Sequence, residues 1–168
     1  MTSSIKTFSN YFAFLLLTSF LAACATAPTE TTSSSSTNQS QVVGGVYVGT
    51  ETIEMLAVDV PDRVFFAYDS YSLAASAQAT LNKQAKWLKA NPSVAIAVEG
   101  HADERGTREY NLALGDRRAS SVKDYLMSQG ISSNRISTIS YGKERPVKSG
   151  SNDTAWAQNR RSVSVRTN

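Results

Sequence analysis

The sequence predicts an α/β two-layer sandwich, with helices packed on one face of a mixed sheet of about four strands. Over residues 61–168, short β-branched or aromatic segments alternate with longer segments whose apolar residues recur at helical spacing. Such alternation is typical of strand–helix–strand units, in which a right-handed connection joins parallel strands. A chain of 168 residues has room for one such domain and additional segments.

The first half of this domain is predicted to contain a strand, a helix and a second strand. Residues 63–68 are aromatic or β-branched and are bounded by turn residues, which favours a strand. Residues 72–90 show helical spacing, with Ser70 or Ser72 as a possible cap and an Asn-Pro pair at the end. Residues 94–99 are apolar at positions facing both sides, which favours a central strand.

The second half is predicted to begin with a longer helix over residues 107–129, which Gly130 closes. A third strand at residues 135–141 follows it. The connection between the central strand and this third strand is therefore helical, and we expect the two strands to be parallel neighbours.

The two ends of the domain are less regular. Residues 153–158 are predicted to form a short helix and residues 161–166 the last strand, with Val163 and Val165 facing the core. Residues 42–60 combine valines with several glycines, which argues for loose or edge structure, and no element is assigned to them.

The N-terminal residues are predicted to form an export signal that ends at a lipid attachment site. Lys6 precedes an apolar run that is too short to span a bilayer, and residues 1–23 end in small side chains before Cys24. This pattern resembles the lipobox of bacterial lipoproteins, in which the cysteine thiol receives a diacylglyceryl group. The alternatives are an ordinary signal peptide with an incidental cysteine and a transmembrane anchor. Residues 24–41 contain no large apolar side chain and are expected to form a flexible linker.

Composition excludes some classes of function. The 17 basic and 14 acidic residues become 16 and 14 once Lys6 is removed with the signal, a net charge of +2. This balance is too mild and too mixed to suggest nucleic acid as a partner. A single cysteine excludes an internal disulfide.

The densest polar cluster lies at residues 100–111, where the central strand ends and the longer helix begins. This edge of an α/β sheet is the usual place for a binding site. Gly100 and Gly106 allow tight turns and leave room for a ligand. Arg118 follows Asp103 by fifteen residues, about four helical turns along.

With the segments at 140–146 and 159–161, this cluster resembles the OmpA-like family of peptidoglycan-binding domains, and within it the lipoproteins of the Tol-Pal system. The resemblance covers about residues 62–166. It implies binding to the free end of diaminopimelate in uncrosslinked stem peptides, without a cofactor. Since no aspartate follows Cys24, it also implies anchorage in the outer membrane, with the domain in the periplasm. The implied partners are peptidoglycan, TolB, and as further candidates TolA and other outer-membrane proteins.

The resemblance also implies which residues hold the ligand. The free end carries an ammonium and a carboxylate on one carbon, so its site needs an anion and a cation a few ångströms apart. Asp103 is expected to accept from the ammonium and Arg118 to fork onto the carboxylate. Supporting roles are expected for Asn111 through hydrogen bonds, Tyr68 and Asp69 at the rim, the backbone amides near Asp69 and Ala102, and Arg160 on the far side. Outside this motif, Asp103 would be an acidic residue near a helix start and Arg118 a solvated charge.

We expect a binder rather than an enzyme. His101 is the only histidine and no nucleophile motif accompanies it, so it is expected to be structural. Asp103 and Glu104 are adjacent and would not face one another across a sugar, as a glycosidase requires. Porin tails and flagellar stator anchors carry the same domain but need membrane-spanning segments, which residues 25–60 lack. A free-standing wall-anchoring lipoprotein without Tol partners remains an alternative.

Overall fold

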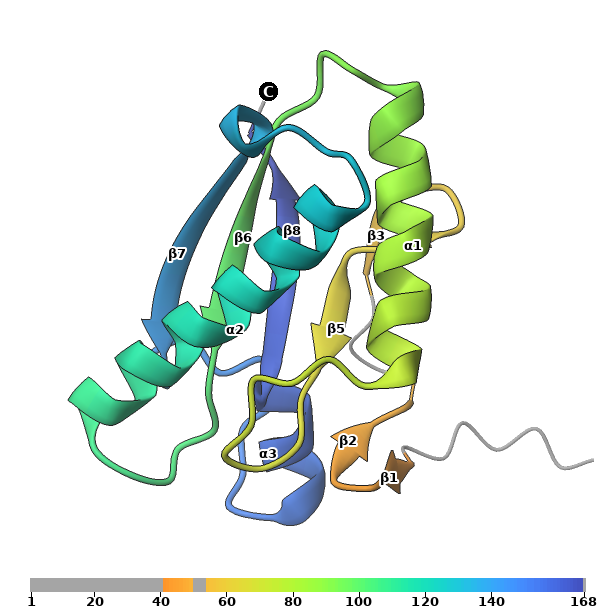
Figure 1. Ribbon diagram of the computed structural model, residues 1–168. Coiled ribbons are helices and arrows are strands. Elements are labelled where there is room, and N and C mark those ends of the chain that lie inside the picture. The colour runs from red at the N-terminus through yellow and green to blue at the C-terminus, as the bar shows by residue number, and fades with distance from the viewer. Residues whose placement is uncertain (1–40, 50–53, 168) are drawn as a thin grey trace, which may run out of the picture. The chain divides into compact units, whose positions relative to one another are not determined.

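The computed structural model describes residues 41–49 and 54–167, and their fold confirms the predicted class. Four strands form a mixed sheet in the order β5-β8-β6-β7 (Figure 1). The strands β6 and β7 are parallel, whereas β8 runs antiparallel to both of its neighbours. The bounds of these strands are Arg63–Phe65 for β5, Ile96–His101 for β6, Ile136–Gly142 for β7 and Arg161–Arg166 for β8.

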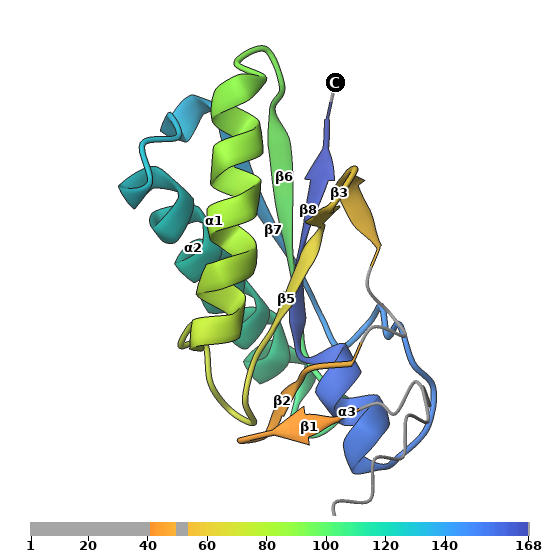
Figure 2. The same cartoon turned by 90° about the vertical axis from the view of Figure 1, so that its right-hand side faces the viewer.

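Two helices cover one face of this sheet. Helix α1 spans Ala75–Ala90 and helix α2 spans Arg108–Ser128, and both lie on the same side of the strands (Figure 2). The core between them and the sheet is apolar and fully buried. Its central members are Leu81, Leu88, Val98, Val122 and Leu126.

The segment at 42–60, which the sequence left unassigned, supplies two short hairpins. Strands β1 (Val42–Val43) and β2 (Val46–Tyr47) form the first, and β3 (Met55–Ala57) and β4 (Val60–Pro61) form the second. The second hairpin contributes Leu56 and Val60 to the main core. The first forms a smaller apolar cluster, in which Tyr47 meets the edge of Phe65 with ring centroids 4.7 Å apart.

Strand β8 turns towards the helices the side that was expected to face away from them. Ser162 and Ser164 lie on the helix side, because Ser162 pairs with the core residue Val64 and the Ser164 hydroxyl donates to Gln84 Oε1 at 2.8 Å. The prediction that Val163 and Val165 face the core holds only in part: Val163 is buried, but on the side of the sheet away from the helices, and Val165 is exposed. Strand alternation shows that two faces differ but not which one faces the helices. Here a buried glutamine of α1 provides the partner that makes the polar face the inner one.

Strand β5 ends earlier, and helix α1 begins later, than the sequence predicted. Strand β5 stops at Phe65 instead of continuing to residue 68, since the N–H of Phe66 donates to the Arg160 carbonyl and the chain then turns away. Helix α1 begins after Ala74, so neither Ser70 nor Ser72 caps it. The Ser70 hydroxyl instead accepts the amide of Ser72 within the preceding turn.

The remaining elements follow the prediction closely. Helix α2 ends in a turn with Gly130 at φ 88°, and the Ile131 amide reaches back to the Leu126 carbonyl, as in a Schellman motif. A 3₁₀ turn, η1 (Ser133–Arg135), precedes β7, and helix α3 (Asp153–Asn159) precedes β8.

Within residues 41–49 and 54–167, none of the helices has the length and apolar character needed to cross a membrane. The predicted signal, Cys24 and the predicted linker up to residue 40 lie outside the described residues.

Candidate functional site

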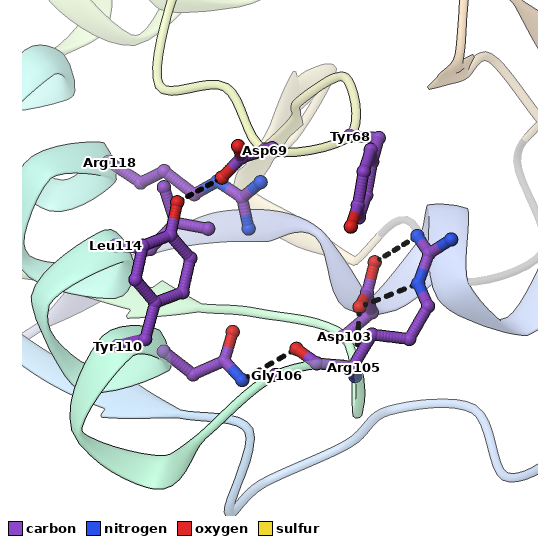
Figure 3. A pocket seen from close by; sticks show the side chains of 9 residues that line it. Tyr68, Asp69, Asp103, Arg105, Gly106, Tyr110, Leu114 and Arg118 are labelled. Atoms are coloured by element: carbon purple, nitrogen blue, oxygen red, sulfur yellow. Dashed lines mark hydrogen bonds and ion pairs between the residues drawn. The ribbon is translucent and has the colours of Figure 1, made fainter.

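A pocket of about 200 Å³ lies at the carboxyl end of β6, between the start of α2 and the loop that follows β5 (Figure 3). Strand ends of an open α/β sheet are the expected place for a ligand. The pocket is smaller than the 300–1,000 Å³ typical of drug-sized ligands, which suits the end of a molecule rather than a whole sugar chain. Its lining consists of Tyr68, Asp69, Asp103, Arg105, Gly106, Tyr110, Asn111, Leu114 and Arg118.

Glycines and a helix cap bring these residues together. A Cβ on Gly100 would lie 1.9 Å from the carbonyl oxygen of Gly115, so only glycine lets α2 approach the end of β6 this closely. Gly106 turns the chain at φ 93°, and the Thr107 hydroxyl then caps α2 by accepting the amide of Tyr110 at 3.2 Å. The loop between β6 and α2 is thereby held against the pocket.

The carboxylate of Asp103 is buried and fully engaged with the chain's own donors. Arg105 donates to it through Nη2 at 2.6 Å, through Nε at 3.1 Å and through its backbone amide at 3.1 Å. Arg160 adds a fourth contact from Nη1 at 3.3 Å. Burial would raise the pKa of Asp103, but the hydrogen bonds from Arg105 and Arg160 prevail and hold that pKa below its usual value.

Arg105, which the sequence analysis did not single out, is a half-buried cation that lines the pocket. Its guanidinium lies 4.1 Å from the ring centroid of Tyr68 and 4.2 Å from that of Trp156, between two aromatic rings. The indole N–H of Trp156 donates to Glu104 at 2.9 Å, which fixes the second ring. Arg105 lies two positions after Asp103, and this proximity could have identified it as a site residue from the sequence. Nothing in the sequence indicated that Trp156 would lie beside it.

Arg118 is fully buried and braces the loops around the pocket. Its guanidinium donates to the carbonyls of Ser70 and His101 at 2.8 Å each, and to that of Ala67 at 3.2 Å. Burial, reinforced by the positive charge of Arg160, lowers the pKa of Arg118 to about 10, so it stays charged at neutral pH. The side chain thus holds three loop carbonyls and also lines the pocket, whereas the sequence analysis expected only a contact with the ligand's carboxylate.

Asp69 supplies a second carboxylate on the opposite side of the pocket. It adopts a left-handed backbone conformation with φ 50°, which turns the chain at the end of the β5 loop. The hydroxyl of Tyr110 donates to this carboxylate, and the guanidinium of Arg118 lies beside it (Figure 3). The bond to Asp69 raises the pKa of Tyr110 above its usual value.

Other residues expected at the site use their polar groups to hold the surrounding loops in place. Asn111 is buried, and its side-chain amide donates to the carbonyls of Arg105 and Thr107 at 2.8 and 3.0 Å. The amide of Ala102, expected to be available to a ligand, is already committed, since it donates to the Gly142 carbonyl at 2.8 Å. The Arg160 guanidinium links Asp103 to the carbonyls of Phe66 and Gly45, and so ties the first hairpin to the site.

His101 is buried at the end of β6, as a structural residue would be. Burial and the nearby charge of Arg161 lower the pKa of His101 to about 3, so it is neutral across the physiological range. Among the described residues, no group of three or more His, Cys, Asp or Glu side chains is arranged to hold a metal ion.

Comparison with known proteins places the chain in a family. The model of the OmpA family matches residues 65–160. A peptidoglycan-associated lipoprotein of Brucella melitensis is 59% identical over 108 residues, which cover 64% of each chain. One of Pseudomonas aeruginosa is 52% identical over 97 residues, covering 58% of this chain and 57% of the other. The match therefore spans less than two thirds of these relatives' length.

Solved structures agree with the sequence matches. The crystal structure of the peptidoglycan-associated lipoprotein from Burkholderia pseudomallei has a TM-score of 0.62 and 43% identity, covering 63% of this chain and 90% of that one. The C-terminal domain of Helicobacter pylori MotB shares the fold alone, with a TM-score of 0.60 at 22% identity over 64% of this chain and 84% of that one. Because the family model covers more than half of the sequence and the fold agrees, the chain belongs to the OmpA family.

Proposed function

We propose that this domain binds peptidoglycan non-covalently by the free zwitterionic end of diaminopimelate in uncrosslinked stem peptides. The observation that carries the proposal is one small pocket with carboxylates of Asp69 and Asp103 on its walls and the buried cation Arg118 between its loops. An ammonium and a carboxylate on one carbon match such a pair of opposite charges. The names of the relatives, peptidoglycan-associated lipoproteins, support the same ligand.

In the proposed complex, each charged residue of the pocket has a role. Arg118 keeps up to two N–H groups beyond the three that it donates to carbonyls, and its positive charge attracts the ligand's carboxylate. Asp69, exposed at the rim, and Asp103, deeper in the pocket, are the acceptors for the ammonium. The face of Tyr68 lines one side, and Asn111 acts by holding the loop in place. The function is recognition, without a chemical step.

The proposed anchor completes the arrangement. Residues 1–23 serve as the signal, Cys24 carries the lipid, and residues 24–41 form a tether between the outer membrane and the periplasmic domain. Buried acyl chains contribute about 0.8 kcal/mol per methylene, and two or more chains make the anchoring stable. Replacement of Cys24 by serine is expected to move the protein from the membrane fraction to the soluble fraction, and retention in the membrane would contradict the lipid anchor.

A chain held at both ends couples the outer membrane to the wall. Within the Tol-Pal system, such coupling maintains the outer membrane and draws it inward during division, with TolB and TolA as partners. The alternative is a free-standing wall anchor without Tol partners. Co-purification of the full chain separates the two, because a Tol-Pal component should retain TolB or TolA.

Retention on isolated sacculi tests the wall-binding site. Asp103→Asn and Asp69→Asn remove one negative charge each while keeping the shape, and Asp116→Asn on the exposed side of α2 is the matched control. A charge-assisted hydrogen bond contributes about 1.5–3 kcal/mol, so each pocket variant is expected to lose roughly 10-fold or more in affinity. Wild-type retention in both pocket variants would refute the site.

A further inference from the structure

We propose that Arg105 is an internal competitor of the ligand: its guanidinium occupies the subsite for the ligand's ammonium and must swing out before the ammonium can reach Asp103. The proposal rests on the proposed function and names the regulation of that same site. It makes Arg105 a residue that determines both the affinity and the specificity of the pocket.

The first support is the coordination of Asp103. An ionised carboxylate offers about four lone-pair positions. Three donors from Arg105 and one from Arg160 already surround it. An ammonium therefore has no free acceptor position on Asp103 unless one of these donors leaves.

The second support is that the two arginines differ in their freedom to leave. The side chain of Arg160 is 6% exposed, and it is also bound to the carbonyls of Phe66 and Gly45. The side chain of Arg105 is 32% exposed, and Asp103 is its only hydrogen-bond partner among the described residues. Arg105 is consequently the donor that can rotate into solvent while Arg160 keeps Asp103 partly paired.

The third support is the chemistry of the place that Arg105 fills. Its guanidinium lies between the faces of Tyr68 and Trp156 and against a carboxylate (Figure 3 shows Tyr68 and Asp103). Aromatic faces and a carboxylate together recognise a cation of any kind, including an organic ammonium. Exchange of Arg105 for a ligand ammonium replaces one cation by another, so the charge around the buried Asp103 is preserved.

Because of this exchange, the affinity for the ligand depends on the fraction of molecules in which the Arg105 side chain has left Asp103 and points into solvent. The state in which it remains on Asp103 is called closed. The apparent dissociation constant equals the intrinsic constant divided by that fraction, so an Arg105 that is closed in 90–99% of molecules weakens binding by about 10- to 100-fold. A ligand without an ammonium cannot take the place of Arg105 and gains nothing from its departure.

Calorimetric titration of the full chain with the tripeptide L-Ala-γ-D-Glu-meso-diaminopimelate tests the proposal. Arg105→Gln removes the competing cation, and Arg108→Gln, on an exposed arginine outside the pocket, is the matched control. Arg105→Gln is expected to bind the tripeptide about 10- to 100-fold more tightly than wild type, and Arg108→Gln to equal wild type. Equal or weaker binding by Arg105→Gln, with a wild type that binds, overturns the competitor and leaves the proposed function standing.

A second measurement uses the unmodified protein. The Nε–H resonance of Arg105 is expected to shift and to exchange faster with water when wild type is saturated with the tripeptide, but not with its analogue acetylated at the terminal amine. An unchanged resonance at saturation overturns the proposal. Binding by Arg105→Gln but not by wild type would support it, whereas failure of both proteins to bind would refute the competitor together with the proposed function.

Discussion

Replacement of the buried Arg118 by methionine separates the structural role of this residue from its role at the pocket. Methionine has an unbranched apolar side chain that fills much of the same volume but cannot donate to the carbonyls of Ala67, Ser70 and His101. Hydrogen bonds to a charged group contribute about 1.5–3 kcal/mol each, so the three together contribute roughly 5–9 kcal/mol.

Part of this contribution is offset by the cost of burying the cation. Burial lowers the pKa of Arg118 from its ordinary value to about 10, which corresponds to about 3 kcal/mol against the charged form. The net loss of stability expected for Arg118→Met is therefore roughly 2–6 kcal/mol, in the range of a broken buried polar network.

Urea unfolding followed by circular dichroism measures this loss, provided that the slope with denaturant is unchanged. Arg117→Met is the matched control, because Arg117 neighbours Arg118 on the same helix but is exposed, and its change should stay within about 0.5 kcal/mol. A variant at Arg118 as stable as the control would refute the reasoning that the three carbonyl contacts brace the site. The test also shows whether any loss of wall binding at this position arises from unfolding.

Three further predictions follow from burial and packing. The pKa of His101 is about 3 in the folded chain and about 6.5 in the unfolded one, so the unfolded chain binds a proton first as the pH falls. The free energy of unfolding should therefore fall by up to about 5 kcal/mol between pH 6.5 and pH 3. Urea unfolding at each pH measures this change, and the His101→Gln variant should lack it. Gly100→Ala should destabilise by more than about 3 kcal/mol in the same assay, since its Cβ would overlap a backbone carbonyl, and a neutral result would contradict the close packing of α2 on β6. Ser164→Ala should lower the free energy of unfolding by about 1–3 kcal/mol, because it leaves the buried Gln84 oxygen without its donor. Val165→Ser should lower it much less, because Val165 is exposed. A larger loss for Val165→Ser than for Ser164→Ala would instead indicate that the valine side of β8 faces the helices.

Most elements of the fold could be predicted from the sequence because they are encoded locally. The apolar spacing of residues 72–90 and 107–129 and the turn at Gly130 depend on neighbours within a few positions, and both helices were found close to their predicted ends. The orientation of β8 could not be predicted, since it depends on Gln84 of α1, eighty residues from Ser164. The start of α1 was placed too early because the Ser70 hydroxyl accepts the Ser72 amide in a turn before the helix instead of capping it.

The location of the candidate site and the family followed from a short motif, because residues 100–111 are contiguous and lie where a strand meets a helix. Only the tertiary structure decided how the charges pair. It turned Arg118 towards three carbonyls, set Arg105 on Asp103 and brought Trp156 from α3 against it. The physical reason is that a charge near a binding cleft has several partners within reach, and burial and packing of distant segments determine which of them it keeps.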